Sequence, residues 1–419
     1  MKKIRRVLTF LVAAAMIVAS VSCKKEVTAE DLMVNVEEGD ASEIYLDDTF
    51  CDKYCAAAFA MLSHEYSEDG PNVVISPLSV YYNLALLANG ATGETKSQLE
   101  KMLDKYYPTD TMNIYMHSFM ENLHDTDTAK FYFDSAIWAN SDKNVDVSDE
   151  FLAAAKTFYK ASAYKESFGE TAVNNINNWA SNKTNMYSER ILKDMPSDAP
   201  LYLANYALLD ADWESPISPE NVLDGKFKAF GSEEQDVQMM SSYESTFIGQ
   251  EEEVRGFIKN YAGGNYAFLA IIPMNENKSA IANYIDFLSK DKYYQDLIKK
   301  RKEYRVVDAS IPKFSCEYTG GLKSMLEDME LGNIFNSQYA GLDQIGSSDE
   351  ELYVGDISVS TGLAVTEKGT RKGTGANVGN TGVGTNVIPI SLNRPFIFAV
   401  VDTKRYLPII VGAVNSVKD

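Results

Sequence analysis

Apolar residues follow two different spacings along the chain, and segments of the two kinds alternate unevenly. Helical spacing marks stretches near residues 77–89, 95–103 and 149–160, and another stretch that begins at Val173. Alternating or continuous apolar character marks the candidate strands, which are 130–140, 202–213, 266–274, 304–314, 352–365, 394–402 and 408–414. Long strands separated unevenly by helices predict one α+β body with large, mostly antiparallel sheets. The lack of a regular βα rhythm argues against a Rossmann fold or a TIM barrel.

The helix expected after Ser76 has its own start and stop signals. Ser76 is a good N-cap, Pro77 suits the first helical position, and Gly90 can end the helix. The residues from Val80 to Asn89 are almost uniformly apolar, so this helix should be buried on all sides.

The amino terminus has the pattern of an export signal. A basic start is followed by an apolar run from Val7 to Val18 and by small residues before Cys23. This arrangement resembles a bacterial lipoprotein signal, which predicts removal of residues 1–22 and lipidation of Cys23. An ordinary secretory signal with an incidental cysteine is the alternative. Residues 23–44 are acidic and poor in aromatic side chains, which predicts a solvated tether between the anchor and the folded body.

Acidic residues outnumber basic ones. The chain has 60 Asp and Glu against 39 Lys and Arg, and its formal net charge is −21. Residues 1–22 hold four basic residues and no acidic one, so their removal makes the net charge −25. Nucleic-acid binding and electrostatic adsorption to anionic lipid both need clustered Lys and Arg, so the charge balance argues against both. With 45% apolar and 11% aromatic residues, most of the chain can bury a large core.

Cysteine and histidine are scarce. Cys51 and Cys55 lie four residues apart in a helix-like stretch where a disulfide would be strained, so both are expected in or beside the core, and Cys316 has no obvious partner. The three histidines, His64, His117 and His124, are scattered, so no metal or other cofactor is expected. No histidine follows His124 and no G-x-S-x-G motif is present. Most of the chain therefore lacks the base of a hydrolytic triad, and we expect no enzymatic activity.

Six short motifs occur in order over most of the chain. They are Asn72–Ser79 (N-x-x-x-S-P-x-S), Ile176–Trp179 (I-N-x-W), Asn205–Trp213, Val237–Met240 (V-x-M-M), Ile311–Phe314 (with P-K-F) and Ile390–Val400. Their order and spacing resemble those of the serpin family across nearly all of residues 45–417. Each motif alone could arise by chance, but six in the right order are highly specific.

The resemblance implies a fold and a mechanism. The fold is a single α+β domain over residues 45–419, with a five-stranded central sheet, two smaller sheets, eight or nine helices and an exposed reactive loop at about residues 367–388. In the implied mechanism, a serine protease attacks the loop and forms an acyl-enzyme. The cleaved loop then inserts into the central sheet as a new strand and traps the protease.

The reactive loop begins with a segment that resembles the family's hinge. Its key residues are Glu367, Gly369 and Thr370. Counting forward from Glu367 by the family's spacing places the scissile residue at Val383, with Gly384 after it, whereas counting back from Pro395 gives Gly384. Val383 is the only branched apolar residue between Gly379 and Thr385, which predicts an elastase-like target protease.

Alternation along an inserted strand predicts a difficulty at Lys372. If Thr370 points into the core, as in the family, so does Lys372, where the family prefers Ala. A buried ammonium costs several kcal/mol unless it is paired, so insertion could be slowed and the loop consumed as a substrate. A nearby acidic group, or a side chain that reaches solvent, could offset this cost.

Other positions that the resemblance implies are structural. Ser76, Ser79 and Asn205 resemble members of the family's shutter, a hydrogen-bonded cluster beneath the strands that open. Trp213 resembles the tryptophan of the breach, where the loop first enters. The position of the family's shutter histidine is occupied by Val359, which predicts an unsatisfied polar group or a repacked shutter.

Two hypotheses follow from these residues. The first is a monomeric, lipid-anchored serpin at a bacterial outer membrane or cell surface that irreversibly inhibits elastase-like serine proteases. The alternative is a non-inhibitory protein of the same fold that acts as a protease substrate or binding module, which Arg371, Lys372 and Val359 favour.

Overall fold

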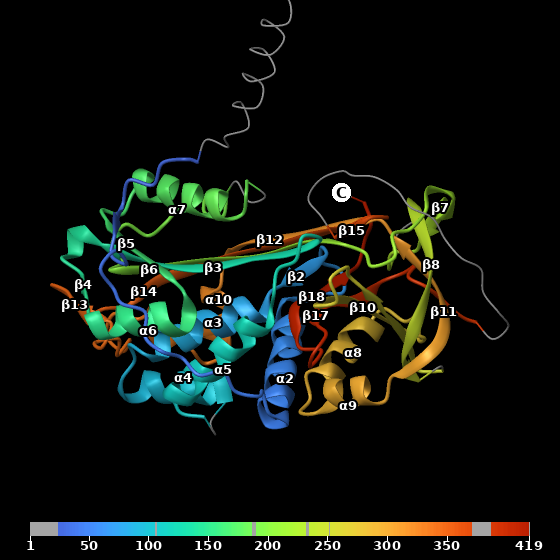
Figure 1. The fold of residues 1–419 in the computed structure, drawn as a ribbon, viewed down its shortest axis with the longest axis horizontal. Helices are drawn as coiled ribbons and strands as arrows, with labels where there is room; N and C mark the ends of the chain where they lie inside the picture. The colour runs from blue at the N-terminus through green and yellow to red at the C-terminus, as the bar shows by residue number, and fades with distance from the viewer. Residues whose placement is uncertain are drawn as a thin grey trace, which may run out of the picture.

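The computed structural model describes residues 24–418 except 105–106, 187–189, 232–233, 251 and 371–386. Strands and helices alternate unevenly, as the sequence predicts (Figure 1). The described residues form nine α-helices, which are α2 (Asp48–Glu65), α3 (Pro77–Ala88), α4 (Gly93–Asp104), α5 (Thr109–Asn122), α6 (Asp149–Tyr159), α7 (Glu170–Lys183), α8 (Ala280–Leu288), α9 (Tyr293–Lys299) and α10 (Lys323–Asp328).

The central sheet has seven strands in the order β1-β5-β3-β6-β15-β14-β12. Their bounds are β1 (Glu30–Asp31), β5 (Ser162–Glu166), β3 (Ala129–Asn140), β6 (Leu201–Asp212), β15 (Gly369–Thr370), β14 (Val354–Val365) and β12 (Phe314–Gly321). The expected number of five was therefore too low. The two additional strands, β1 and β15, have two residues each, and such short pairings leave no periodic pattern in a sequence.

A second sheet has nine strands where the resemblance implied smaller sheets. Along its path run β16 (Ile388–Ser391), β11 (Lys302–Pro312), β8 (Gln235–Gln250), β9 (Val254–Asn260), β10 (Tyr266–Pro273), β17 (Phe396–Asp402), β18 (Pro408–Val414) and β2 (Val73–Ile75), and β7 (Val222–Phe227) pairs with β8. A third, two-stranded sheet joins β13 (Gly346–Ser347) to β4 (Asp146–Val147).

Helix α3 confirms the prediction made from its caps and apolar pattern. The Ser76 hydroxyl accepts a hydrogen bond from the Ser79 amide at 3.1 Å, Pro77 is the first helical residue, and all twelve residues are buried. Because the helix is apolar on every side, it can lie inside the molecule between the two large sheets (Figure 1).

Helix α7 covers the opposite face of the central sheet. Trp179 of α7 packs on Tyr206 of β6 with ring centroids 5.2 Å apart, and both belong to an apolar cluster separate from the main core. The strands β3 and β6 therefore lie between α3 on one face and α7 on the other (Figure 1). This layering positions the seam at which β6 meets β14.

The three cysteines that the structure describes are buried, as predicted for Cys51 and Cys55. Cys51, Cys55 and Cys316 are free thiols, and burial raises the pKa of each, to about 12 for Cys316. All three remain protonated at neutral pH and serve as small core residues.

The segment expected to be a solvated tether lies against the body for much of its length. Residues 30–31 form β1 at the edge of the central sheet, and the Lys156 ammonium donates to the carbonyl oxygen of Val36 at 2.5 Å. Further along, the amide of Gly39 donates to the Thr157 hydroxyl and that of Ile44 to the Ser118 hydroxyl. The segment does expose acidic side chains, but its backbone is held by the domain.

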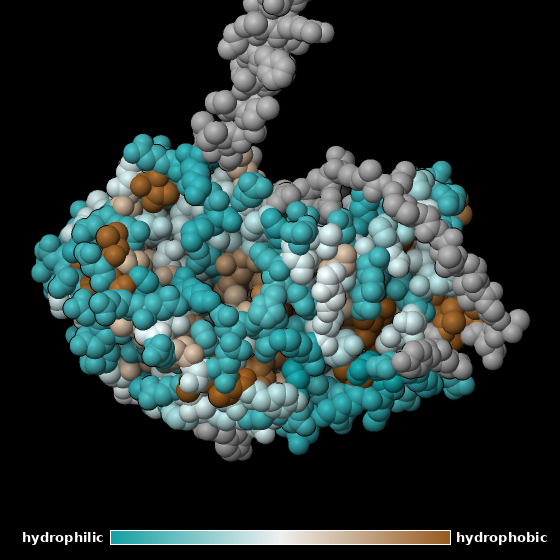
Figure 2. Space-filling model, in the orientation of Figure 1, coloured by the Kyte–Doolittle hydropathy of each residue, from teal (hydrophilic) through white to brown (hydrophobic). Residues whose placement is uncertain are grey.

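The surface matches the polar composition. Figure 2 shows a mostly hydrophilic face with small, separate apolar patches. The large apolar side chains that are exposed come from distant parts of the chain, such as Val34, Leu223 and Tyr339.

Candidate functional site

The seam between β6 and β14 is closed over most of its length. The two strands pair in parallel from Val354↔Leu201 to Gly362↔Leu208. Beneath α7, the Tyr202 and Ser358 hydroxyls share a hydrogen bond of 2.7 Å across the seam. Any strand that enters the sheet here must first break these contacts.

The expected hinge residues already lie at one end of this seam. Strand β15 pairs with β6 through Gly369↔Asp212 and Thr370↔Ala211, and with β14 through Thr370↔Val365. A Cβ added at Gly369 would lie 1.9 Å from the carbonyl oxygen of Ala211, so only glycine fits this close approach. Gly369 and Thr370 thus lie between β6 and β14 at this end of a seam that is otherwise closed.

Thr370 points into the core. Its side chain is fully buried, and its hydroxyl shares a hydrogen bond with the Tyr261 hydroxyl. This orientation agrees with the inward face that the resemblance implies for Thr370.

Trp213 holds the turn before the hinge. Its indole N–H donates to the carbonyl oxygen of Thr366 at 2.8 Å, and its amide donates to that of Lys368 at 2.7 Å. The indole stacks on Tyr261 with ring centroids 4.5 Å apart. Trp213 and Thr370 therefore share Tyr261 as a neighbour, which joins the breach to the hinge.

Two ion pairs flank this region. Glu367 pairs with Lys313 at 2.9 Å. Partial burial of Glu367 acts to raise its pKa, but the hydrogen bond from Lys313 helps bring that pKa below its usual value. Lys259 is buried and pairs with Glu244 at 2.8 Å, and its Nζ lies 5.2 Å from the centre of the Trp213 ring.

The residues expected to form the shutter are all buried, but the hydrogen bonds do not join them into one cluster. The Ser76 hydroxyl donates to the carbonyl oxygen of Ile409, whereas the side-chain Nδ2 of Asn205 donates to the Ser135 hydroxyl at 2.8 Å. The Ser79 hydroxyl and the Asn205 carbonyl oxygen (Oδ1) are buried with no hydrogen-bond partner among the described residues.

Val359 explains the unpaired oxygen of Asn205. The two residues are direct partners across the seam, so their side chains lie on the same face of the sheet. Valine cannot donate a hydrogen bond to Oδ1. The structure thus contains the unsatisfied polar group predicted from the absence of histidine at this position.

A histidine at position 359 should donate a hydrogen bond to the unpaired side-chain oxygen of Asn205. We expect Val359→His to exceed Val359→Phe in free energy of unfolding by about 1 kcal/mol at pH 8, because the two side chains are comparably bulky and only histidine can donate to Oδ1. Denaturant unfolding of both variants measures the difference. Equal stabilities would show that Asn205 gains no partner from the imidazole.

Several functional residues carry only a weak signal in the sequence or none. Lys313 lies in the P-K-F motif, which could have drawn attention to it, but nothing in the local sequence marks Tyr261, Lys259 or Glu244. Tyr261 and Lys259 contact Trp213 from a part of the chain distant in the sequence, and Glu244 pairs with Lys259. The predicted scissile residues Val383 and Gly384, and the predicted lipidation site Cys23, lie outside the described residues.

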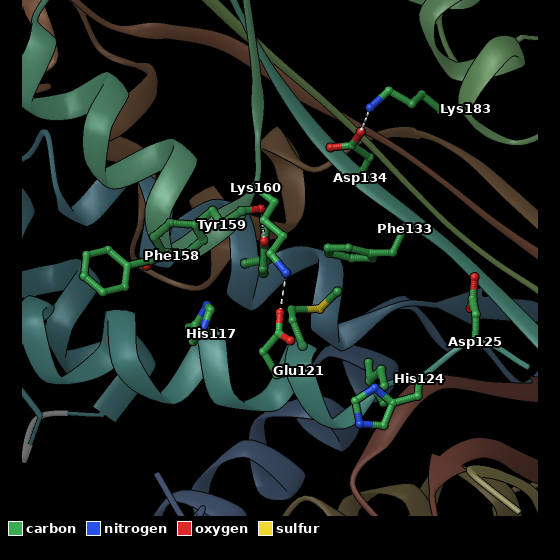
Figure 3. Close-up of a pocket in the computed structure, with 13 residues that line it drawn as sticks. His117, Glu121, His124, Asp125, Phe133, Asp134, Phe158, Tyr159, Lys160 and Lys183 are labelled. Carbon is green, nitrogen blue, oxygen red and sulfur yellow. Dashed lines mark hydrogen bonds and ion pairs between the residues drawn. The ribbon is translucent and has the colours of Figure 1, made fainter. Parts of the chain in front are cut away.

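A separate cavity of about 420 Å³ lies among α5, α6 and β3 (Figure 3). His117 and His124 line it, together with the ion pairs Lys160–Glu121 and Lys183–Asp134. Among the described residues, its lining includes no serine, threonine or cysteine to pair with either histidine.

Within the described ranges, no group of histidine, cysteine and carboxylate side chains is arranged to hold a metal ion. The same ranges contain no helix that is long and apolar enough to cross a membrane.

The fold is therefore an α+β domain in which the two-residue strand β15 lies between β6 and β14 at one end of the central seam. A family model for serpins, described as serine protease inhibitors, matches residues 52–417. The chain belongs to the serpin family.

Known proteins are similar in sequence or structure to most of this chain. An uncharacterised serpin-like protein from Methanosarcina acetivorans is 24% identical over 86% of this chain and 84% of its own length. Alpha-1-antiproteinase 2 from Equus caballus is 26% identical over 85% of this chain and 84% of its own length. The crystal structure of tengpin, a thermophilic serpin, in its native state superposes with a TM-score of 0.86 at 34% identity, covering 93% of this chain and 99% of tengpin.

Proposed function

We propose that this protein irreversibly inhibits serine proteases, of elastase type, by inserting its cleaved reactive loop into the central sheet. The observation that carries the proposal is β15. Two hinge residues pair with β6 and β14 at the end of a seam that is otherwise closed. The family of serine protease inhibitors to which the chain belongs supports the same activity.

In the proposed chemistry, one covalent step is followed by competition between hydrolysis and loop insertion. The hydroxyl of the protease serine attacks the carbonyl carbon of Val383, forms an ester with it and releases the amino group of Gly384. Water would normally hydrolyse the ester and free the protease. Insertion of the loop before hydrolysis would carry the acylated protease along with Val383 and trap it as the ester.

The register of β15 specifies where the inserted residues would lie. Extending both of its pairings puts residue 372 between Leu209 and Leu363, and Ala376 between Asn205 and Val359. The same extension agrees with the native pairing of Val359 with Asn205. The two halves of the seam are therefore already in register to receive one antiparallel strand.

Incubation with a pancreatic-type elastase tests the inhibitory function. We expect a complex that survives denaturing electrophoresis, and we expect Val383→Arg to shift complex formation towards trypsin-like proteases because the scissile residue fills the protease's specificity pocket. Mass measurement of the released carboxy-terminal fragment locates the bond. Cleavage by every protease tested, with a carboxy-terminal fragment and no complex, would support the substrate hypothesis instead.

We also propose that Cys23 anchors the protein to the bacterial envelope through lipid chains. Each buried CH₂ contributes about 0.8 kcal/mol, so two or more chains hold a protein without a membrane helix. We expect radiolabelled palmitate to label the wild type and not Cys23→Ala in the producing cells. Equal labelling of both would exclude Cys23 as the acceptor.

A further inference from the structure

Three asparagines of α7 bind the chain's own amino-terminal segment. Asn175, Asn178 and Asn182 are three and four residues apart, so they lie on one face of the helix. We refer to these three residues as the asparagine ladder, and to residues 25–31, which lie across it, as the strap. Figure 1 shows the start of the chain running past α7 and β5.

The asparagine ladder binds the strap mainly through its backbone. The Lys25 amide donates to Asn182 Oδ1 at 2.8 Å, and Asn182 Nδ2 donates back to the Lys25 carbonyl oxygen at 2.7 Å. Asn178 Nδ2 donates to the carbonyl oxygen of Glu26 at 2.9 Å. Such contacts fix an extended peptide with little dependence on its side chains, as strand addition does.

Asn175 and the sheet edge bind the remainder of the strap. The Thr28 amide donates to Asn175 Oδ1 at 3.1 Å, and Glu30 and Asp31 then pair with β5 as the edge strand β1. Val27 and Ala29 pack against the apolar cluster beneath α7. The strap therefore connects the exposed side of α7 to the edge of the sheet.

Within the described part of the chain, the contact between α7 and the sheet leaves buried polar groups without partners even with the strap in place. The indole nitrogens of Trp138 and Trp179 and the hydroxyl of Ser181 are buried with no hydrogen-bond partner among the described residues. Each such group costs about 1–3 kcal/mol. Helix α7 should therefore separate from the sheet more easily than its apolar contacts alone suggest.

Opening of the seam requires α7 to move. The helix packs on β6 through Trp179 and Tyr206, and the segment that follows it reaches β14, where Pro196 lies against Gly355. Separation of β6 from β14 thus changes the contacts beneath α7 and breaks the hydrogen bond between Tyr202 and Ser358. A strap that fixes α7 to β5 opposes this movement.

We infer that the asparagine ladder and the edge of β5 form a peptide-binding groove, which the strap fills, and that occupancy of the groove slows opening of the seam. The groove stands on its own contacts, whereas its effect on protease trapping rests on the proposed inhibitory function. Emptying the groove should speed loop insertion after cleavage and shorten the lifetime of the uncleaved state.

The first test removes two members of the asparagine ladder from the full chain. Alanine suits a helix better than asparagine, so Asn178→Ala with Asn182→Ala should not weaken α7 through helix propensity. Asn174→Ala is the matched control, because Asn174 is an exposed residue of the same helix without a bond to the strap. By hydrogen–deuterium exchange, we expect at least tenfold faster exchange over residues 25–31, and faster exchange in α7, only in the double variant.

The second test fills an emptied groove from outside. In a chain from which residues 24–31 are deleted, so that no strap backbone remains, a fluorescent peptide of residues 24–32 should bind saturably and restore protection of α7. It should not bind the wild type, whose own strap is present at a high effective concentration. Adding Asn178→Ala and Asn182→Ala should abolish binding. Equal exchange in the double variant and the control, or no peptide binding to the emptied groove, would overturn the inference.

Protease trapping separates this inference from the proposed function. With elastase, the double variant should consume fewer molecules per protease trapped than Asn174→Ala, and should lose trapping activity sooner on storage. If no form traps a protease while exchange and peptide binding respond, the inhibitory function fails and the groove stands. If exchange responds while trapping stays equal to the control, the groove does not control seam opening.

Discussion

Thr370→Arg should turn the protein from an inhibitor into a substrate. Thr370 is fully buried between β6 and β14, and its hydroxyl is bonded to Tyr261. An arginine at this position should leave the sheet in the uncleaved protein, and insertion would then have to bury its unpaired guanidinium at a cost of several kcal/mol. Each 1.36 kcal/mol added to the insertion barrier slows insertion tenfold, so hydrolysis of the acyl-enzyme should win the race.

The number of inhibitor molecules consumed per protease trapped measures this change. We expect it to rise at least tenfold, while the rate of the first cleavage stays nearly constant because Thr370 lies thirteen residues before Val383. Thr370→Ser, which keeps the hydroxyl and adds no charge, is the matched control and should remain an inhibitor. Undiminished trapping by Thr370→Arg would mean that trapping does not require residue 370 to be buried between β6 and β14.

Local chemistry explains why α3 and the long strands could be predicted from the sequence. The N-cap at Ser76 and the proline that follows it act within one helical turn, and the apolar residues of α3 are consecutive. Strands such as β10 and β17 are buried along their whole length, so they appear in the sequence as continuous apolar runs.

The course of the amino-terminal segment could not be predicted in this way. Its acidic composition indicates solvation, but the asparagine ladder binds mainly backbone groups, which every sequence contains. The residues that recognise the segment lie about 150 positions away in the chain. Composition reports the preference of a side chain for water and carries no information on such backbone contacts.

The hinge also combines a feature that the local sequence predicts with contacts that depend on the fold. The residue types at Glu367, Gly369 and Thr370 predict a hinge, and the structure shows that Gly369 and Thr370 are paired in the sheet. That result depends on the register between β6 and β14 and on contacts from Tyr261 and Lys313, which come from other parts of the chain. A linear motif indicates which residues are suited to a hinge, whereas the fold determines that two of them are paired in the sheet.

Lys372→Ala should have the opposite effect to Thr370→Arg and make the protein a more efficient inhibitor. The register of β15 places an inserted residue 372 between Leu209 and Leu363, which are 4% and 5% exposed and belong to the main core. A lysine there either loses its hydration or distorts the strand to reach solvent. Removing its charge lowers the cost of insertion, so fewer molecules should be consumed per protease trapped.

Arg371→Ala is the matched control for Lys372→Ala, because it removes the same charge from the neighbouring position. The register places residue 371 opposite Asp210, on the other face of β6, where side chains are only partly buried. Arginine there keeps contact with water and with an acidic neighbour, so its removal should change the stoichiometry little. Titration of elastase with the wild type and both variants compares the two faces directly. An equal improvement in both variants would attribute the cost to net loop charge, whereas improvement in Lys372→Ala alone identifies burial of the ammonium as the barrier.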